Sequence, residues 1–195
     1  MAVILGFSIS LMAADIPFSL SEDLSIEQVK AKLSNRSGFK FDPEGSKANR
    51  LKFELKNFDI DGVSFSSIWV EFYEDKLMEI TFFGGGSSLV KLDRTDQQIK
   101  NLITLKTFYL QQGEKLVDDD LSSAKTYSDL LQDRFLIIFD KGPCQVKIGT
   151  LKAEFGGIWT TPLVQYSVKE VSAKNQKQRE SEAMEKKEKS KSLLK

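Results

Sequence analysis

Acidic side chains in predicted strands are the first candidates for chemistry in this sequence. Glu71, Glu79 and Glu154 each lie in a segment that is predicted to be a strand. Two carboxylates on either side of a glycosidic bond can act as general acid and as nucleophile or base. The same residues could equally face solvent without any chemistry. A carboxylate-dependent hydrolase or carbohydrate-active protein is therefore one alternative for the function.

Histidine and cysteine, the usual partners in nucleophilic catalysis, are nearly missing from the chain. The sequence contains no His and one Cys, Cys144. This composition excludes Ser-His-Asp and Cys-His catalysis as usually built, and every zinc site that includes His. A nucleophilic Cys144 would need a neighbouring base, and a single Cys cannot form an internal disulfide. We therefore name no catalytic residue and favour a protein that is not an enzyme.

Three short motifs resemble metal or phosphate loops, but each lacks part of the required pattern. Asp59-x-Asp61-Gly62 opens like a calcium loop, yet position 12 is Val70 rather than Glu, which favours a β-turn. The adjacent carboxylates of 118–120 cannot converge on one ion, so this segment is predicted to be a polar connection. Residues 84–88, Gly-Gly-Gly-Ser-Ser, lack the Gly-Lys-Ser/Thr ending of a phosphate loop and are predicted to be a linker. We expect no metal and no cofactor.

Aromatic residues are the stronger candidates for recognition of a partner. Trp69, Tyr73, Trp159 and Tyr166 lie in or beside predicted strands. Beneath helices they would be core residues, whereas on the opposite sheet face they would offer rigid contact area to a partner. Trp69 and Trp159 each neighbour Ser or Thr, which favours the exposed face more for these two. We take all four as candidate binding residues.

A helix and three strands are expected to position the first of these residues. Ser25 and Gln28 match a capping box, and apolar residues follow at helical spacing, which predicts a helix from Ile26 to Leu33 or Ser34. Alternating apolar and polar residues then predict antiparallel strands joined by turns, at 51–55, 63–72 and 77–83.

The second half of the chain repeats this order less clearly. Thr95 and Gln98 match another capping box, before a helix that could run to Leu110 or Gln112 with Gly113 as its C-cap. A short extended or helical piece at 125–131 and strands at 134–139, 145–155 and 163–171 follow, with Pro162 at an edge or strand start.

These elements predict an α+β protein in which helices pack on one face of an antiparallel sheet. Two tandem αβββ units, 15–86 and 87–173, would produce this order. One continuous sheet without internal symmetry would also produce it. The sequence leaves both arrangements open.

The N-terminal residues resemble a signal peptide. Residues 2–14, AVILGFSISLMAA, form an apolar run that ends in small residues, although no Lys or Arg precedes it. The run is too short to span a membrane, and a buried N-terminal strand is the alternative. With 1–14 removed, we expect the domain of 15–173 to be periplasmic or secreted, without an integral membrane span.

Charge is concentrated at the other end of the chain. Residues 174–195 contain eight Lys or Arg and four Glu, a net charge of +4, so 1–173 carries −4 and the whole chain is neutral. A slightly acidic body gives no reason to expect nucleic-acid binding. The tail is rich in helix formers and poor in apolar residues, so we expect a charged helix or a disordered segment.

Two segments resemble a group of bacterial exported domains. IPFSLSEDLSIEQVKAKL, at 16–33, is similar to the opening helix of the β-lactamase-inhibitor-protein-like fold and of the SmpA/OmlA envelope lipoproteins. FYEDKLMEITFF, at 72–83, is similar to their hairpin. The chain departs from these groups because it has no lipidation Cys and no disulfide pair. The resemblance implies helices on an antiparallel sheet, with the sheet used for protein–protein recognition.

The function we predict from the sequence is an exported, non-enzymatic binding module. It would engage a protein or cell-envelope component through one face of its sheet. The alternatives are the carboxylate-dependent hydrolase described above and a structural or assembly protein that uses its charged tail.

Overall fold

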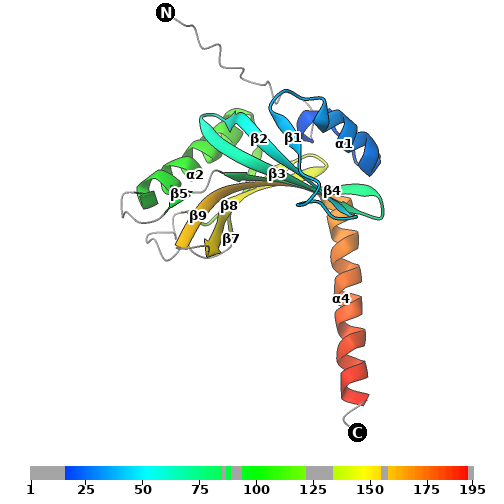
Figure 1. Ribbon diagram of the computed structural model, residues 1–195. Coiled ribbons are helices and arrows are strands. Elements are labelled where there is room, and N and C mark those ends of the chain that lie inside the picture. The colour runs from blue at the N-terminus through cyan, green and yellow to red at the C-terminus, as the bar shows by residue number, and fades with distance from the viewer. Residues whose placement is uncertain (1–15, 85–86, 89–93, 122–133, 155–157, 193–195) are drawn as a thin grey trace, which may run out of the picture.

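A computed structural model describes residues 16–84, 87–88, 94–121, 134–154 and 158–192. The predicted signal peptide and the piece predicted at 125–131 lie outside these residues. Within them, helices pack on one face of an antiparallel sheet, which confirms the predicted α+β class (Figure 1).

The first helix forms where its capping box predicts it. The helix α1 spans Ile26–Ser34, the Ser25 hydroxyl accepts a hydrogen bond from the Gln28 amide, and the Gln28 side chain accepts one from the Ser25 amide. Val29 and Leu33 are its buried residues. A short 3₁₀-helix, η1 (Pro17–Ser19), precedes α1 and buries Phe18 in the core.

The second helix ends as predicted but begins earlier. The helix α2 covers Arg94–Gln111, so Thr95 lies inside it rather than at the N-cap position that the capping box predicted. Leu102, Leu105 and Tyr109 form its buried side. Gly113 follows with a φ of +78°, the left-handed conformation that makes glycine the usual residue after a helix.

Nine antiparallel strands form the sheet in the described part of the chain. The eight that lie on one continuous path follow the order β1-β2-β3-β4-β9-β8-β7-β6, and β5 pairs with β9 beside β4. Their bounds are β1 (Phe39–Phe41), β2 (Arg50–Ile60), β3 (Val63–Tyr73), β4 (Lys76–Gly84), β5 (Ser87–Ser88), β6 (Lys115–Asp119), β7 (Arg134–Lys141), β8 (Cys144–Glu154) and β9 (Ile158–Val168).

The two halves of the chain meet at the centre of this sheet. Each half supplies a helix and then a series of antiparallel strands, and the last long strands, β4 and β9, pair with each other. The halves therefore share one continuous sheet and one core cluster. Whether they are tandem units in the sense of an internal repeat stays a prediction.

The structure corrects the local predictions at several places. The strand predicted at 163–171 ends at Val168, and residues from 169 onward are helical. Pro162 lies inside β9, a central strand, rather than at an edge or strand start. Asp118 and Asp119 belong to the edge strand β6 rather than to a connection. The predicted linker of 84–88 is in part structured, because Gly84 ends β4 and Ser87–Ser88 form β5.

The two faces of the sheet differ in character, and the register of the strands shows which residues lie on each face. One face lies under α1 and α2 and carries the apolar core, including Phe53, Ile68, Phe82, Val164 and Ile148 on adjoining strands. The opposite face carries the alternate residues of the same strands. We call this second surface the open face.

The charged tail is helical as far as Ser192. The helix α4 spans Lys169–Ser192, which at 1.5 Å per residue is about 36 Å long. Val171 is buried, whereas the residues from Gln176 to Ser190 are exposed. Figure 1 shows α4 extending away from the sheet, in the direction opposite to α1. Pairs such as Lys174–Glu170 support it along its own surface.

Candidate binding face

Polar residues occupy a continuous row on the open face. Each of seven neighbouring strands contributes one polar residue, and this residue lies opposite the polar residue of the next strand. From β2 to β6 the row contains Arg50, Glu71, Glu79, Ser167, Gln145, Asp140 and Lys115. We call it the first row.

A second row runs parallel to the first, two residues further along each strand, or three on β6, where the register shifts. It contains Lys52, Trp69, Thr81, Gln165, Lys147, Ile138 and Asp118. The row beyond it is more apolar, with Phe83, Leu163 and Phe135. Polarity on the open face therefore rises toward the end of the sheet at which α4 begins.

Glu71 and Glu79 are directly opposite each other because β4 contains a β-bulge. The two-residue turn pairs Tyr73 with Lys76 and Phe72 with Leu77, which would next place Glu71 opposite Met78. Instead the register shifts by one residue and Glu71 pairs with Glu79. Since side chains alternate between faces, this extra residue brings Glu79 to the open face.

Glu79 is a carboxylate of the open face whose pKa is raised rather than lowered. Its two oxygens accept hydrogen bonds from the Ser167 hydroxyl and the Gln165 amide group, each at 3.2 Å. Burial, and then the charge of Glu71, raise the pKa of Glu79, and the charges of Lys147 and Arg179 offset this only in part. The site thus holds a partly desolvated carboxylate beside a second one.

Trp69 lies beside this pair and is half-buried between two side chains. The Arg50 guanidinium lies 4.0 Å from the centre of its ring, and the Phe83 ring centroid lies 4.7 Å from the Trp69 ring centroid. Arg50 also lies 3.8 Å from the Glu71 carboxylate. Arg50 therefore joins the aromatic pair to the carboxylate pair.

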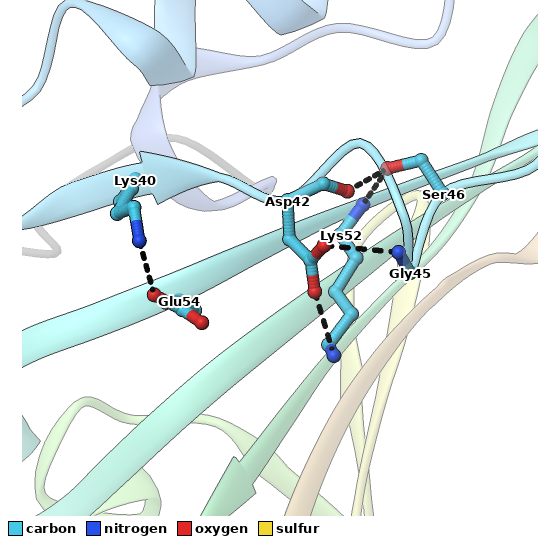
Figure 2. A network of polar contacts seen from close by, with 6 residues as sticks. All are labelled: Lys40, Asp42, Gly45, Ser46, Lys52 and Glu54. Atoms are coloured by element: carbon cyan, nitrogen blue, oxygen red, sulfur yellow. Dashed lines mark hydrogen bonds and ion pairs between the residues drawn. The ribbon is translucent and has the colours of Figure 1, made fainter.

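Ion pairs border the open face at its β1–β2 edge (Figure 2). The Lys40 ammonium lies 3.2 Å from Glu54, and the Lys52 ammonium lies 2.8 Å from Asp42. The Asp42 carboxylate also accepts a hydrogen bond from the Gly45 amide, at 2.9 Å. The Lys52 and Gly45 contacts lower the pKa of Asp42. Each of these edge carboxylates thus forms an ion pair, whereas the hydrogen bonds to Glu79 come from neutral side chains.

The candidate binding residues from the sequence take different places. Trp69 lies on the open face, and the Tyr73 hydroxyl contacts Gln178 of α4 near the β3–β4 turn. Trp159 lies in β9 opposite Ala153 of β8, and its side chain lies outside the described part of the structure. These residues do not form one cluster.

Tyr166 lies on the other side of the sheet, in the core beneath α2. It is 1% exposed, and its hydroxyl lies 2.5 Å from that of Tyr109 in a hydrogen bond. Burial raises the pKa of both hydroxyls. The pair joins α2 to β9, so we leave Tyr166 out of the candidate face.

Sequence reasoning did not identify Arg50, Gln165, Ser167 or Lys147 as parts of this face. Gln165, Ser167 and Lys147 come from β8 and β9, and the pairing of β4 with β9 brings them to Glu79. Arg50 comes from β2 and reaches the face through the pairing of β2 with β3. The alternation of polar and apolar residues in each strand was the available signal, but it does not identify the neighbouring strand.

Within the residues that the structure describes, neither a metal-ligating cluster nor a membrane-spanning helix is found. No group of three potential metal-ligating residues occurs in the described ranges. None of the described helices has the length and apolar character needed to cross a membrane. Comparison of the chain with protein-family models, with curated proteins and with solved structures finds no match. The family resemblance therefore stays a prediction.

Replacing Glu79 by Gln should stabilise the protein at neutral pH. An acid whose pKa is higher in the folded than in the unfolded chain costs stability when it ionises, and that cost disappears as the pH falls below both values. Glutamine keeps an acceptor for Ser167 without the charge. We expect a higher urea midpoint for Glu79→Gln than for the wild type at pH 7, and a smaller difference at pH 4.

The control for this measurement is Glu54→Gln, on the same face. Glu54 is exposed and its partner Lys40 lies 3.2 Å away, so removing its charge should not raise the midpoint at pH 7. A Glu79→Gln variant that is less stable than the wild type at pH 7 would contradict the assigned environment of Glu79.

Proposed function

We propose that this protein is an exported, non-enzymatic binding module that engages a protein or cell-envelope component through the open face. The observation that carries the proposal is the pattern of that face. Two rows, polar except for Trp69 and Ile138, cross seven strands on the side of the sheet opposite to α1 and α2. Trp and Arg are enriched in protein-recognition sites, which place such residues inside a polar rim.

The dimensions of the open face bear on the kind of partner. Seven strands spaced about 4.8 Å apart span about 29 Å, and three rows along the strands cover about 14 Å. The resulting area of about 400 Å² is half of what one partner contributes to a standard interface. The open face alone thus fits a small, transient interface, and additional contact with α4 would bring it to the usual size.

A matched pair of variants tests this proposal. Gln145 lies half-buried in the first row, and Gln97 is exposed on α2. We expect proteins retained from a cell-envelope extract by the immobilised chain to be lost with Gln145→Arg and kept with Gln97→Arg. Retention that both variants preserve, or none above a bare support, would contradict the proposal.

The hydrolase remains a second candidate because of one observation. Glu71 and Glu79 are a direct cross-strand pair, and such pairs bring side chains within about 5.5 Å, close to the separation in retaining glycosidases. Both carboxylates, however, rise from the same sheet face, and Ser167 and Gln165 hydrogen-bond one of them. If this candidate is right, the wild type hydrolyses a glycan, and Glu71→Gln and Glu79→Gln each abolish that hydrolysis.

A further inference from the structure

The strand β6 forms one edge of the sheet and exposes most of its side chains. It is the last strand on the continuous path and pairs with β7, so the backbone groups on its outer side have no strand partner in the described part of the chain. An unpaired edge is the place where a further strand can add to a sheet. Within β6 only Leu116 is partly buried, and the other four side chains are exposed.

Exposed apolar residues lie beside this edge. Ile103, Leu110 and Val117 are 48%, 45% and 55% exposed, and they are three of the four large apolar residues that are exposed in the described part of the chain. Val117 belongs to β6. Ile103 and Leu110 flank Lys106 on one side of α2, three residues before it and four after it. Since Lys106 forms an ion pair with Asp119 of β6, this side of α2 is turned toward the edge.

Two opposite charges on β6 have no partner within the chain. Lys115 and Asp118 both lie on the open face, in the first and second rows. Neither forms an ion pair among the residues that the structure describes. The Asp140 carboxylate, on the strand next to Lys115, is bound by Lys169 instead. A strand with one free charge of each sign is complementary to a second copy of itself that runs in the opposite direction.

We propose that a second copy of this chain pairs with the first along β6, with the two strands antiparallel. A two-fold axis between Leu116 and Val117 places Lys115 of each copy opposite Asp118 of the other. Opposite charges at directly opposed positions stabilise a strand pair. The same axis places both α2 helices on one side of the joined sheet, where Ile103 and Leu110 of each copy can be buried at the contact. Two-fold contacts of this kind are the commonest in homo-oligomers.

The pattern of charges favours a copy of this chain over an unrelated strand. Charged residues at an edge normally discourage the addition of a strand. Here the order of the charges is matched by the same five residues of a second copy, read in the opposite direction. The formal net charge of the chain is zero, so two copies do not repel each other as a whole.

The β-bulge in β6 limits the strength of this contact. The register to β7 shifts between Leu116 and Asp118, which disturbs the regular edge. We therefore expect a reversible dimer with a dissociation constant in the micromolar range, as for small interfaces. The contact uses the β6 edge and α2, so it does not depend on the binding function proposed for the open face.

Sedimentation equilibrium of the full chain at micromolar concentrations tests the contact. We expect the wild type to show a monomer–dimer equilibrium. Lys115→Asp and Asp118→Lys should each weaken dimerisation by about tenfold or more, because each change turns two attractive pairs into two repulsive ones. An equimolar mixture of the two variants should form a heterodimer about as tightly as the wild type dimerises. In the mixture, one strand carries two carboxylates and the other carries two ammonium groups.

Two further variants complete the test. Lys177→Asp changes the net charge by the same amount as Lys115→Asp at an exposed position of α4, and it should leave dimerisation unchanged. Ile103→Gln should weaken dimerisation, because less apolar area is then buried at the contact. A wild type that stays monomeric, with its β6 edge covered within the chain or left open, would overturn the proposal. A mixture that dimerises no better than its two components, or an equal loss with Lys177→Asp, would also overturn it.

Discussion

Replacing Phe82 by Ala should lower the free energy of unfolding by about 3–5 kcal/mol, the largest effect that we expect from a single truncation in this chain. Phe82 is fully buried on β4. Its ring stacks on Phe58, with centroids 5.4 Å apart, and contacts Phe18, Phe65 and Tyr166 at 5.8 to 6.1 Å. Removing it would leave a cavity with aromatic walls.

The cavity should be costly because its walls come from separate parts of the chain. Phe18 belongs to η1, Phe58 to β2, Phe65 to β3 and Tyr166 to β9, so no single element can move to fill the space. Domains of this kind have a total stability of about 5–15 kcal/mol. The variant would therefore be close to its folding limit.

Urea denaturation followed by circular dichroism measures the effect, with Phe83→Ala as the control. Phe83 is the next residue, but it lies on the open face, half-buried against Trp69. Its truncation should cost about 1–2 kcal/mol, because less apolar area is lost. Equal losses for the two variants would contradict the faces assigned to them.

The sequence predicted those parts of the fold that depend on near neighbours. The Ser25–Gln28 capping box is a contact between residues three apart, and α1 begins where it predicts. The turn at Asp59 to Gly62 is also local, with Asp61 and Gly62 at positive φ. The strands of each hairpin follow from their alternation.

The candidate site could not be predicted because it depends on pairing and register. The β4–β9 pair joins residues 80 or more positions apart, such as Phe82 and Val164, and no local pattern specifies it. The Glu71–Glu79 pair depends on one bulged residue in β4. Without the bulge, alternation would direct Glu79 toward the helices. The edge strands β1 and β6 were missed because they are short.

Replacing Gly84 by Val should cost about 3 kcal/mol, at the upper end of the range for overpacking, and Gly84→Ala about 1–3 kcal/mol. A Cβ atom at this position would lie 2.5 Å from Cγ and Cδ of Pro162 and 3.0 Å from the Thr161 hydroxyl. That hydroxyl donates a hydrogen bond of 2.6 Å to the Gly84 carbonyl. The backbone of β4 thus approaches β9 too closely for any side chain.

The close approach occurs where β9 changes partner. Pairing with β4 ends at Phe83 and Leu163, and pairing with β5 begins at Ser87 and Thr160. Pro162, which has no amide hydrogen to donate, lies between these two ladders, so its position inside a central strand costs less there. The side chain of Pro162 therefore limits which residue can stand at position 84, at the centre of the sheet.

A double-mutant cycle tests whether the steric contact causes the loss. Pro162→Ala removes Cγ and Cδ, the two atoms nearest to the added Cβ, so Gly84→Ala combined with Pro162→Ala should cost less than the sum of the single changes. We expect a coupling of about 1 kcal/mol in urea denaturation. Strict additivity would show that Gly84→Ala acts through something other than Pro162. In that case the close contact between β4 and β9 would not be the reason that this position requires glycine.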